Sequence, residues 1–343
     1  MARVGSIGSM ATKSVLLKSG QRMPLLGLGT WQVRHEEIEQ AVDAALEAGY
    51  RHIDTAFNYN NEEAIGRALR RWIDGGRCGR EDLFITTKLP HVGNRASDVE
   101  KYLKKSLSRL RLDYVDLYLI HMPFGFVPDS SGENPAKHDD GSYVLDDTDH
   151  VAVWKEMEKQ VDEGLTRNIG VSNYNIEQLE RTVANARILP ATNQVELHAY
   201  LQQTKLRASC AKLGIPITAY SPLGSPGARI HFEQKYNYQY PDNTAPDLLQ
   251  HPLVKDIANA HQKTTAQVLL KHLIQQGIIV IPKSTNPKRI KENAEIFDFQ
   301  LTPDQMMQLS GLDLGEEGRI INFRFWKGVE KHPEYPFTIQ KSA

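Results

Sequence analysis

The chain has 343 residues, 40% of them apolar, with 41 basic residues against 42 acidic ones, a composition typical of a soluble globular protein. A formal net charge of −1 and the lack of any apolar run near the ~20 residues of a membrane span exclude bulk attraction to nucleic acid and insertion into a membrane. Its two cysteines, Cys78 and Cys210, exclude a disulfide scaffold and favour a reducing, cytoplasmic setting.

The N-terminal region predicts a leader followed by a hairpin. Residues 1–13 contain Gly and Ser but no apolar centre, which excludes a secretory signal and predicts a flexible leader. Residues 15–17 and 21–23 flank a Lys-Ser-Gly turn at 18–20, a pattern that predicts a β-hairpin.

Beyond the hairpin, short apolar runs alternate with segments of helical period. This alternation predicts a parallel sheet wrapped by helices, and eight such units predict a (β/α)₈ barrel. The units, each a strand and then a helix, are 25–28 with 36–48, 52–54 with 62–73, 83–88 with 99–110, 115–121 with 151–163, 165–172 with 176–186, 192–196 with 202–213, 217–220 with 265–275, and 278–281 with 289–296.

A doubly wound sheet is the competing fold. It would need a Gly-rich fingerprint after an early strand, and Gly27 and Gly29 supply the first two glycines of that motif. Gln32 stands where the third glycine should be. We therefore favour the barrel.

Two long loops and a tail interrupt the regular pattern. The loops, 123–148 and 223–252, both follow predicted strands, and 315–343 forms an irregular C-terminal tail. Barrel enzymes place their sites on the loops at the C-terminal ends of the strands, so these segments are expected to border the site. With no linker dividing the chain, residues 14–343 are expected to form one domain.

Four reactive side chains lie at or just after predicted strand ends: Asp54, Tyr59, Lys88 and His121. Each one alone has an ordinary structural explanation, such as a capping carboxylate or a core histidine. Adjacent strands lie about 4.8 Å apart, so the four side chains can meet at one mouth of the barrel. Together they favour a catalytic site.

The chain resembles the aldo-keto reductase family over nearly its whole length. The segment GYRHIDTA at 49–56, with Tyr59 and Glu62, is similar to the first family signature, and LDYVDLYLIH at 112–121 is similar to the second. The third is matched by IPKS at 281–284 through Arg289, Glu292 and Asn293. The spacings within Asp54, Tyr59, Lys88 and His121 also match the catalytic tetrad of the family.

This resemblance implies NADPH-dependent reduction of an aldehyde or ketone by a cytoplasmic monomer. Tyr59 would be the proton donor, and Lys88 would lower the pKa of that phenol and stabilise the phenolate. Asp54 would keep Lys88 charged and oriented. His121 would hydrogen-bond the carbonyl of the substrate.

The resemblance also implies a binding site for NADPH. Amide and hydroxyl groups would hold the nicotinamide, Tyr220 would stack on it, the loop at 221–225 would clamp the pyrophosphate, and Lys283 and Arg289 would bind the 2′-phosphate. The expected cofactor residues are Thr30, Trp31, Asp54, Ser172, Asn173, Gln194, Tyr220, Ser221, Leu223, Ser225, Lys283, Ser284, Arg289, Glu292 and Asn293.

The substrate pocket departs from the family pattern. Many relatives have Trp where this chain has Met122 and Pro90, which predicts a wider, softer pocket suited to a bulky, steroid-like ketone, as in some arthropod members. The expected substrate residues are Trp31, Tyr59, Pro90, His121, Met122, Phe124, Phe323 and Trp326.

Other functions remain open alternatives. A cofactor-binding regulatory or structural barrel without activity would keep the nucleotide site but would not need the four reactive residues. A Schiff-base enzyme would need Lys88 with a lowered pKa, whereas Asp54 would raise it. No metal is expected, because His52 and His121 lack a recognisable ligand spacing.

Overall fold

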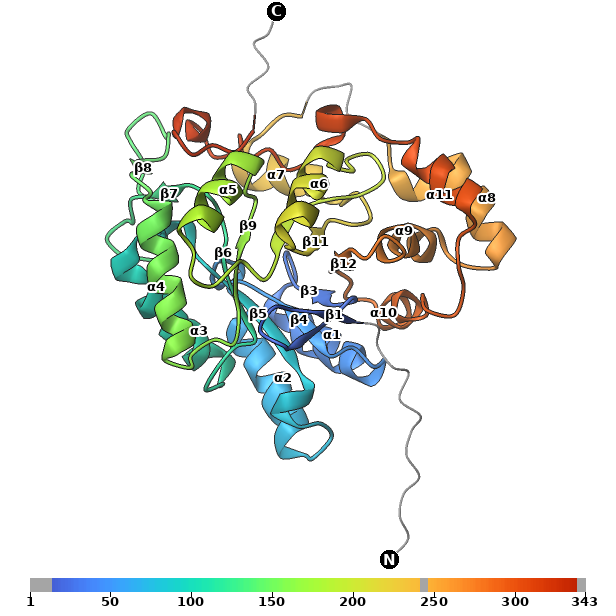
Figure 1. Ribbon diagram of the computed structural model, residues 1–343, viewed down its shortest axis with the longest axis horizontal. Coiled ribbons are helices and arrows are strands. Elements are labelled where there is room, and N and C mark those ends of the chain that lie inside the picture. Colours follow the sequence, from blue (N-terminus) through green and yellow to red (C-terminus); the bar gives the residue numbers. More distant parts are fainter. Residues whose placement is uncertain (1–13, 241–245, 338–343) are drawn as a thin grey trace, which may run out of the picture.

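The computed structural model describes residues 14–240 and 246–337, and its centre is one parallel eight-stranded sheet. The strands are β3 (Leu28–Gly29), β4 (His52–Asp54), β5 (Phe84–Leu89), β6 (Leu117–Ile120), β9 (Ile169–Ser172), β10 (Asn193–Glu196), β11 (Ile217–Tyr220) and β12 (Ile279–Val280). They pair in the order β12-β11-β10-β9-β6-β5-β4-β3. Figure 1 shows them at the centre of the molecule with helices around them.

The two ends of the sheet meet and close the barrel. Parallel bridges join Leu26 to Val280 and Gly29 to Lys283, and the Gly29 N–H donates to Pro282 O at 3.0 Å. A Cβ on Gly29 would lie 2.5 Å from the backbone oxygen of Ile281, so only glycine allows this approach. The predicted barrel is confirmed, and the early glycine serves its closure rather than a dinucleotide fingerprint.

Eight helices surround the sheet, one after each strand, as the sequence predicts. They are α1 (His35–Glu47), α2 (Glu62–Asp74), α3 (Val99–Leu110), α4 (His150–Asp162), α5 (Ile176–Asn185), α6 (Thr204–Leu213), α9 (Thr265–Ile274) and α10 (Pro287–Ala294). Local sequence sets several starts: Asn175 caps α5 in a reciprocal pair with Gln178, and Thr264 does the same for α9 with Gln267. No described helix is long and apolar enough to cross a membrane.

Additional elements occupy the long loops. The first loop holds the hairpin of β7 (Gly125–Phe126) and β8 (Leu145–Asp146), and the second holds α7 (Ala228–Tyr236). Two further helices, α8 (Pro252–His261) and α11 (Pro303–Ser310), lie together outside the ring (Figure 1). They enclose a second, smaller core. None of these elements was expected from the sequence.

The predicted N-terminal hairpin is present as β1 (Ser14–Leu16) and β2 (Arg22–Pro24). The Gln21 amide donates to Asp116 Oδ1 and accepts from the Asn168 amide, both at 2.6 Å. Because Asp116 and Asn168 immediately precede β6 and β9, the hairpin covers the N-terminal end of the barrel. The leader predicted at 1–13 lies outside the described residues, as do the last residues of the tail.

The described part of the tail, 315–337, has only two short 3₁₀ turns, at Gly315–Gly318 and Val329–Lys331. It crosses the C-terminal end of the barrel (Figure 1), where Phe323, Phe325 and Trp326 are buried. The sequence-based expectation of an irregular tail near the mouth therefore matches the path of these residues.

Candidate active site

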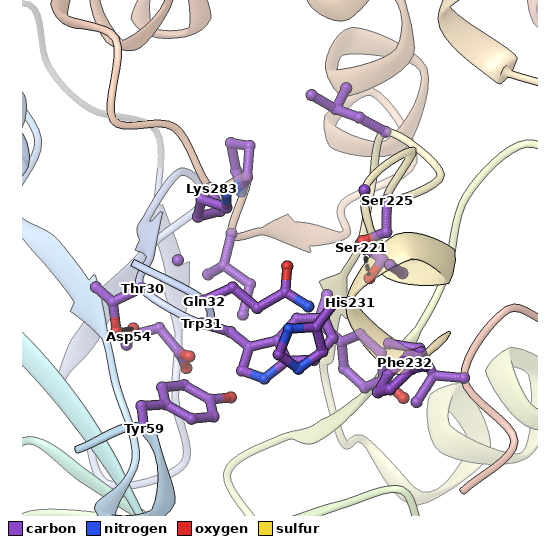
Figure 2. Close-up of a pocket in the computed structure, with 18 of the residues that line it drawn as sticks. Thr30, Trp31, Gln32, Asp54, Tyr59, Ser221, Ser225, His231, Phe232 and Lys283 are labelled. Atoms are coloured by element: carbon purple, nitrogen blue, oxygen red, sulfur yellow. Dashed lines mark hydrogen bonds between the residues drawn. The ribbon is translucent and has the colours of Figure 1, made fainter. Parts of the chain in front are cut away.

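A cavity of about 1260 Å³ opens at the C-terminal end of the barrel. This volume exceeds the ~300–1,000 Å³ of an ordinary small-ligand pocket, so there is room for a cofactor and a substrate together. Figure 2 shows Asp54 and Tyr59 on one side of it, Ser221, Ser225 and Phe232 on the other, and Trp31 and His231 between them.

Four side chains meet at the inner end of the cavity, here called the catalytic cluster: Asp54, Tyr59, Lys88 and His121. Lys88 Nζ donates to Asp54 Oδ1 at 2.6 Å, to Thr55 O at 2.9 Å and to the Tyr59 hydroxyl at 3.3 Å. The rings of Tyr59 and His121 meet edge to face, with centroids 5.6 Å apart.

Lys88 is 0% exposed and does not line the cavity, although it contacts Tyr59, which does. Its three acceptors use all three ammonium protons. A Schiff-base nucleophile needs a free, accessible amine. The position of Lys88 therefore disfavours the Schiff-base alternative and suits a group that acts through Tyr59.

Asp54 is oriented by neighbours on β5 and β10 and by the residue directly after β3. Its Oδ2 accepts from the Gln194 amide at 2.7 Å, its Oδ1 accepts from Lys88, and its backbone oxygen accepts from the Thr30 hydroxyl at 2.9 Å. Because both carboxylate oxygens are bonded and buried, the carboxylate is held in one position.

The electrostatics of the chain alone bear on the expected proton donor, Tyr59. Burial raises the pKa of Tyr59, and the charge of Asp54 raises it further. Burial lowers the pKa of Lys88, although Asp54 opposes that shift. The pKa of Tyr59 is thus raised in the protein without ligands, and the expected stabilisation of its phenolate by Lys88 stays a prediction. Tyr59 is a neutral phenol with its proton in place.

His121 is also neutral. Burial lowers its pKa well below the ordinary value, and the nearby charge of Lys88 adds to that shift. Its Nδ1 is buried without a hydrogen-bond partner in the described residues. His121 lines the cavity, so its neutral imidazole is placed to bind a polar atom of a ligand.

The next part of the cavity is a network of amide and hydroxyl groups. The Asn173 amide donates to His121 O at 2.9 Å, and its Oδ1 accepts from the Tyr220 hydroxyl at 2.8 Å. Ser172 donates to Gln194 O at 2.8 Å. These residues lie on or directly after β9, β10 and β11, so neighbouring strands bring them together beside the catalytic cluster.

Backbone strain concentrates at this cavity. Ten described non-glycine residues have left-handed backbone angles, and four of them are ends of α-helices: Arg111, Gln203, Asn237 and Gln262. The other six all line the cavity: Gln32, Asn60, Asn173, Ser221, Ser225 and Phe323. Strained backbone of this kind clusters at binding and catalytic sites.

The far end of the cavity is positively charged. Lys283 and Arg289 line it with Ser284 and Asn293, and neither cation forms an ion pair within the described part of the chain. The first N–H groups of α10 are already bonded by the Asn286 side chain, which accepts from Lys288 N and Arg289 N. A phosphate here would depend mainly on the side chains.

All fifteen expected cofactor residues line the cavity. Six of the eight expected substrate residues do so as well: Trp31, Tyr59, His121, Met122, Phe323 and Trp326. Pro90 and Phe124 are buried behind the wall, where Phe124 packs against Phe323 and Trp326. Sequence reasoning missed several lining residues, among them His91, His231, Phe232 and Ile321. Of these residues, only His91 could have been predicted from its position, because it follows Pro90 just beyond the end of β5.

No group of three or more His, Cys, Asp or Glu side chains within 14–240 and 246–337 could hold a metal ion.

Comparisons with known proteins agree with this geometry. The model of the Aldo/keto reductase family matches residues 25–313. Aldo-keto reductase family 1 member A1 of Mus musculus is 42% identical over 342 residues, covering 96% of this chain and 99% of that protein, and the Danio rerio protein A1-A is 41% identical over 95% and 98%.

Two solved structures share the fold. The aldose reductase of Schistosoma japonicum has a TM-score of 0.85 at 39% identity, covering 96% of this chain and 100% of its own. An aldo-keto reductase of Bombyx mori, solved in complex with NADP, has a TM-score of 0.82 at 36% identity, covering 95% and 99%.

Proposed function

This chain belongs to the aldo/keto reductase family and is an NADPH-dependent carbonyl reductase, and we propose that the catalytic cluster performs its reaction. The observation that carries the proposal is the direct bond from Lys88 to the Tyr59 hydroxyl at the inner wall of the cavity. The residues expected to bind NADPH all line the same cavity, and they include Lys283 and Arg289.

Bound NADPH supplies the hydride. As the carbonyl oxygen of the substrate gains negative charge, Tyr59 donates its hydroxyl proton to that oxygen. Lys88 then stabilises the phenolate through its hydrogen bond to the Tyr59 oxygen, and Asp54 keeps the ammonium charged and oriented. Neutral His121 binds the carbonyl oxygen and sets its direction of approach.

The test is Tyr59→Phe, which removes the proton donor and keeps the ring. We expect turnover of a small aromatic aldehyde to fall by about 10²-fold or more, because general acid catalysis contributes roughly 10²–10⁴. The dissociation constant for NADPH, from fluorescence titration, should change little. Tyr118→Phe is the matched control, since that hydroxyl is buried away from the cavity. Retention of more than about a tenth of the turnover would assign the proton to another group.

For the substrate we propose a bulky, apolar ketone such as a steroid-like one. Flexible Met122 and the aromatic side chains of Trp31, Phe323 and Trp326 line the cavity beyond the catalytic cluster. A panel of carbonyls from short aldehydes to steroid ketones, compared by kcat/KM with NADPH, tests this. Higher values for small, polar aldehydes than for every bulky ketone would refute it.

We further propose that residues 14–343 form one domain that acts as a cytoplasmic monomer. Both cysteines are free thiols, as expected in a reducing compartment. The exposed large apolar side chains of the described residues are four scattered ones, Leu16, Ile230, Met307 and Leu314, rather than an interface-sized patch. Light scattering at micromolar concentration should give the mass of one chain, and a dimer mass would exclude the monomer.

A further inference from the structure

A buried carboxylate that the proposed reaction does not use lies at the C-terminal end of β10. Glu196 follows Gln194 by two residues, so the two side chains lie on the same side of the strand. Gln194 reaches down to Asp54 of the catalytic cluster. Glu196 is 0% exposed and does not line the cavity.

The Glu196 carboxylate binds the tail. Its Oε1 accepts from the Ile320 N–H and from His198 Nε2, and its Oε2 accepts from the Ile321 N–H, all at 2.8 Å. Burial alone would raise the pKa of Glu196, but the hydrogen bond from His198 and the charge of Arg319 bring it below the ordinary value. An ionised, buried carboxylate therefore joins β10 to residues more than 120 positions further along the chain.

The tail becomes part of the cavity wall directly after this contact. Ile321, Phe323, Phe325 and Trp326 all line the cavity. The ring of Phe323 stacks on Trp326 with centroids 5.8 Å apart, and Phe325 stacks on Phe232 of α7 at 4.1 Å. These rings are the wall on which the remote part of a bulky substrate would rest.

The backbone of this wall is strained. Phe323 has a φ of 62°, a left-handed conformation that a bulky side chain rarely adopts. It lies two residues beyond Ile321, and the Trp326 N–H donates to Phe323 O at 2.8 Å on its other side. Such a conformation persists only where the surrounding structure fixes it. The Glu196 contact supplies that fixation on the N-terminal side.

We infer that Glu196 is a positioning residue for substrate selection: by holding the Ile320 and Ile321 N–H groups it sets the tail as the wall that favours bulky over small carbonyls. This inference rests on the proposed function, because it specifies how the same site selects its substrate. Glu196 itself touches neither the cavity nor the catalytic cluster.

The test is Glu196→Gln. The amide has one acceptor oxygen, and its NH₂ group would face an N–H donor, so at least one tail contact is lost. We expect the ratio of kcat/KM for a bulky ketone to kcat/KM for a small aldehyde to fall about tenfold, the effect of losing one charge-assisted hydrogen bond. The loss should appear in KM for the ketone, with turnover of the aldehyde and the NADPH dissociation constant unchanged. Hydrogen exchange of the tail should accelerate while that of β10 and β11 does not.

Asp116→Asn is the matched control. This buried carboxylate also accepts a backbone N–H, from Ile85 at 2.9 Å, but at the opposite end of the barrel. It should leave the selectivity ratio unchanged. An unchanged ratio in Glu196→Gln, or equal losses on both substrates, would overturn the inference.

A second variant covers the case in which Glu196→Gln does not fold. His198→Leu removes the third donor and keeps the carboxylate, and we expect a smaller fall of the selectivity ratio together with faster exchange of the tail. An unchanged ratio in that variant also overturns the inference. Failure of the proposed function is distinguishable, because wild-type protein would then not reduce the small aldehyde at all.

Discussion

The two ends of the barrel each hold a buried polar network, and the two networks differ in their access to a ligand. At the N-terminal end, Asp116 accepts from Gln21, Arg80 and the Ile85 N–H, under the covering hairpin. At the C-terminal end, the catalytic cluster opens into a cavity, which Asp54, Tyr59 and His121 line. Polar groups bonded under a cover stabilise a fold, whereas polar groups on a cavity wall are available to a ligand.

One strand displays both roles. Asp116 stands just before β6 and His121 just after it, so a four-residue strand separates a structural carboxylate from a candidate catalytic imidazole. Residue type does not distinguish the two roles. The surroundings do, because one end of the barrel is covered and the other is open.

The largest expected effect distinguishes the two networks: a substitution at the C-terminal end should lower turnover, and one at the N-terminal end should lower stability. We expect Lys88→Met to lower turnover by about 10²-fold or more, because the phenolate of Tyr59 loses its ammonium. Asp116→Asn should leave turnover per folded molecule within twofold and lower the free energy of unfolding by about 1–3 kcal/mol, since buried donors lose acceptors. Steady-state kinetics and urea unfolding measure the two. Comparable losses of turnover in both variants would contradict the division.

A second prediction concerns a structural histidine. Burial lowers the pKa of His52 to about 4 from an ordinary 6.5, and its Nε2 lies 3.2 Å from Thr86 Oγ1, away from the cavity. The unfolded chain therefore binds a proton that the folded chain does not. The stability contributed by neutral His52 is present above pH 6.5 and is lost as the pH falls toward 4.

At about 1.4 kcal/mol per pKa unit, this group makes the protein roughly 2 kcal/mol less stable at pH 5 than at pH 7. The non-titrating variant His52→Gln should show a difference between the two pH values that is smaller by that amount in urea unfolding. An identical difference in wild type and variant would show that His52 titrates normally in the fold.

The smallest expected effect concerns the charged far end of the cavity. Arg289→Ala should weaken NADPH binding more than tenfold and NADH binding little, because only NADPH carries the 2′-phosphate that a guanidinium can grip with two donors. Fluorescence titration with each cofactor measures both constants. Lys288→Ala is the control, because that lysine pairs with Glu292 and does not line the cavity. Equal weakening of both cofactors would make Arg289 an ordinary surface charge.

The sequence predicted the barrel because every one of its eight units carries its own periodic signal. Two of the helices it missed, α8 and α11, bury their apolar residues against a second core drawn from distant segments, including Leu248, Val254, Leu301 and Leu309. Contacts between distant segments leave no periodic pattern of apolar residues in the local sequence. The start of α11 was readable, since Thr302 and Gln305 form a capping pair around Pro303.

The site also has features that the sequence predicts and features that it does not. Asp54, Tyr59, Lys88 and His121 were readable because they lie in motifs at strand ends. The direction of the Tyr59 pKa was not, because it depends on burial, which a sequence does not display. The contact between Glu196 and the tail was equally hidden, since nothing local to either segment indicates the other.

The left-handed residues around the cavity imply a trade-off between the stability of the protein and its activity. A non-glycine residue in that conformation costs roughly 1–2 kcal/mol, so exchanging Ser221 or Ser225 for Gly would relax the backbone of the free protein. The same exchange would loosen the loop expected to clamp the cofactor. Selection of variants of this chain for thermal stability should therefore repeatedly yield substitutions at these positions, and the resulting enzymes should be more stable but have lower turnover.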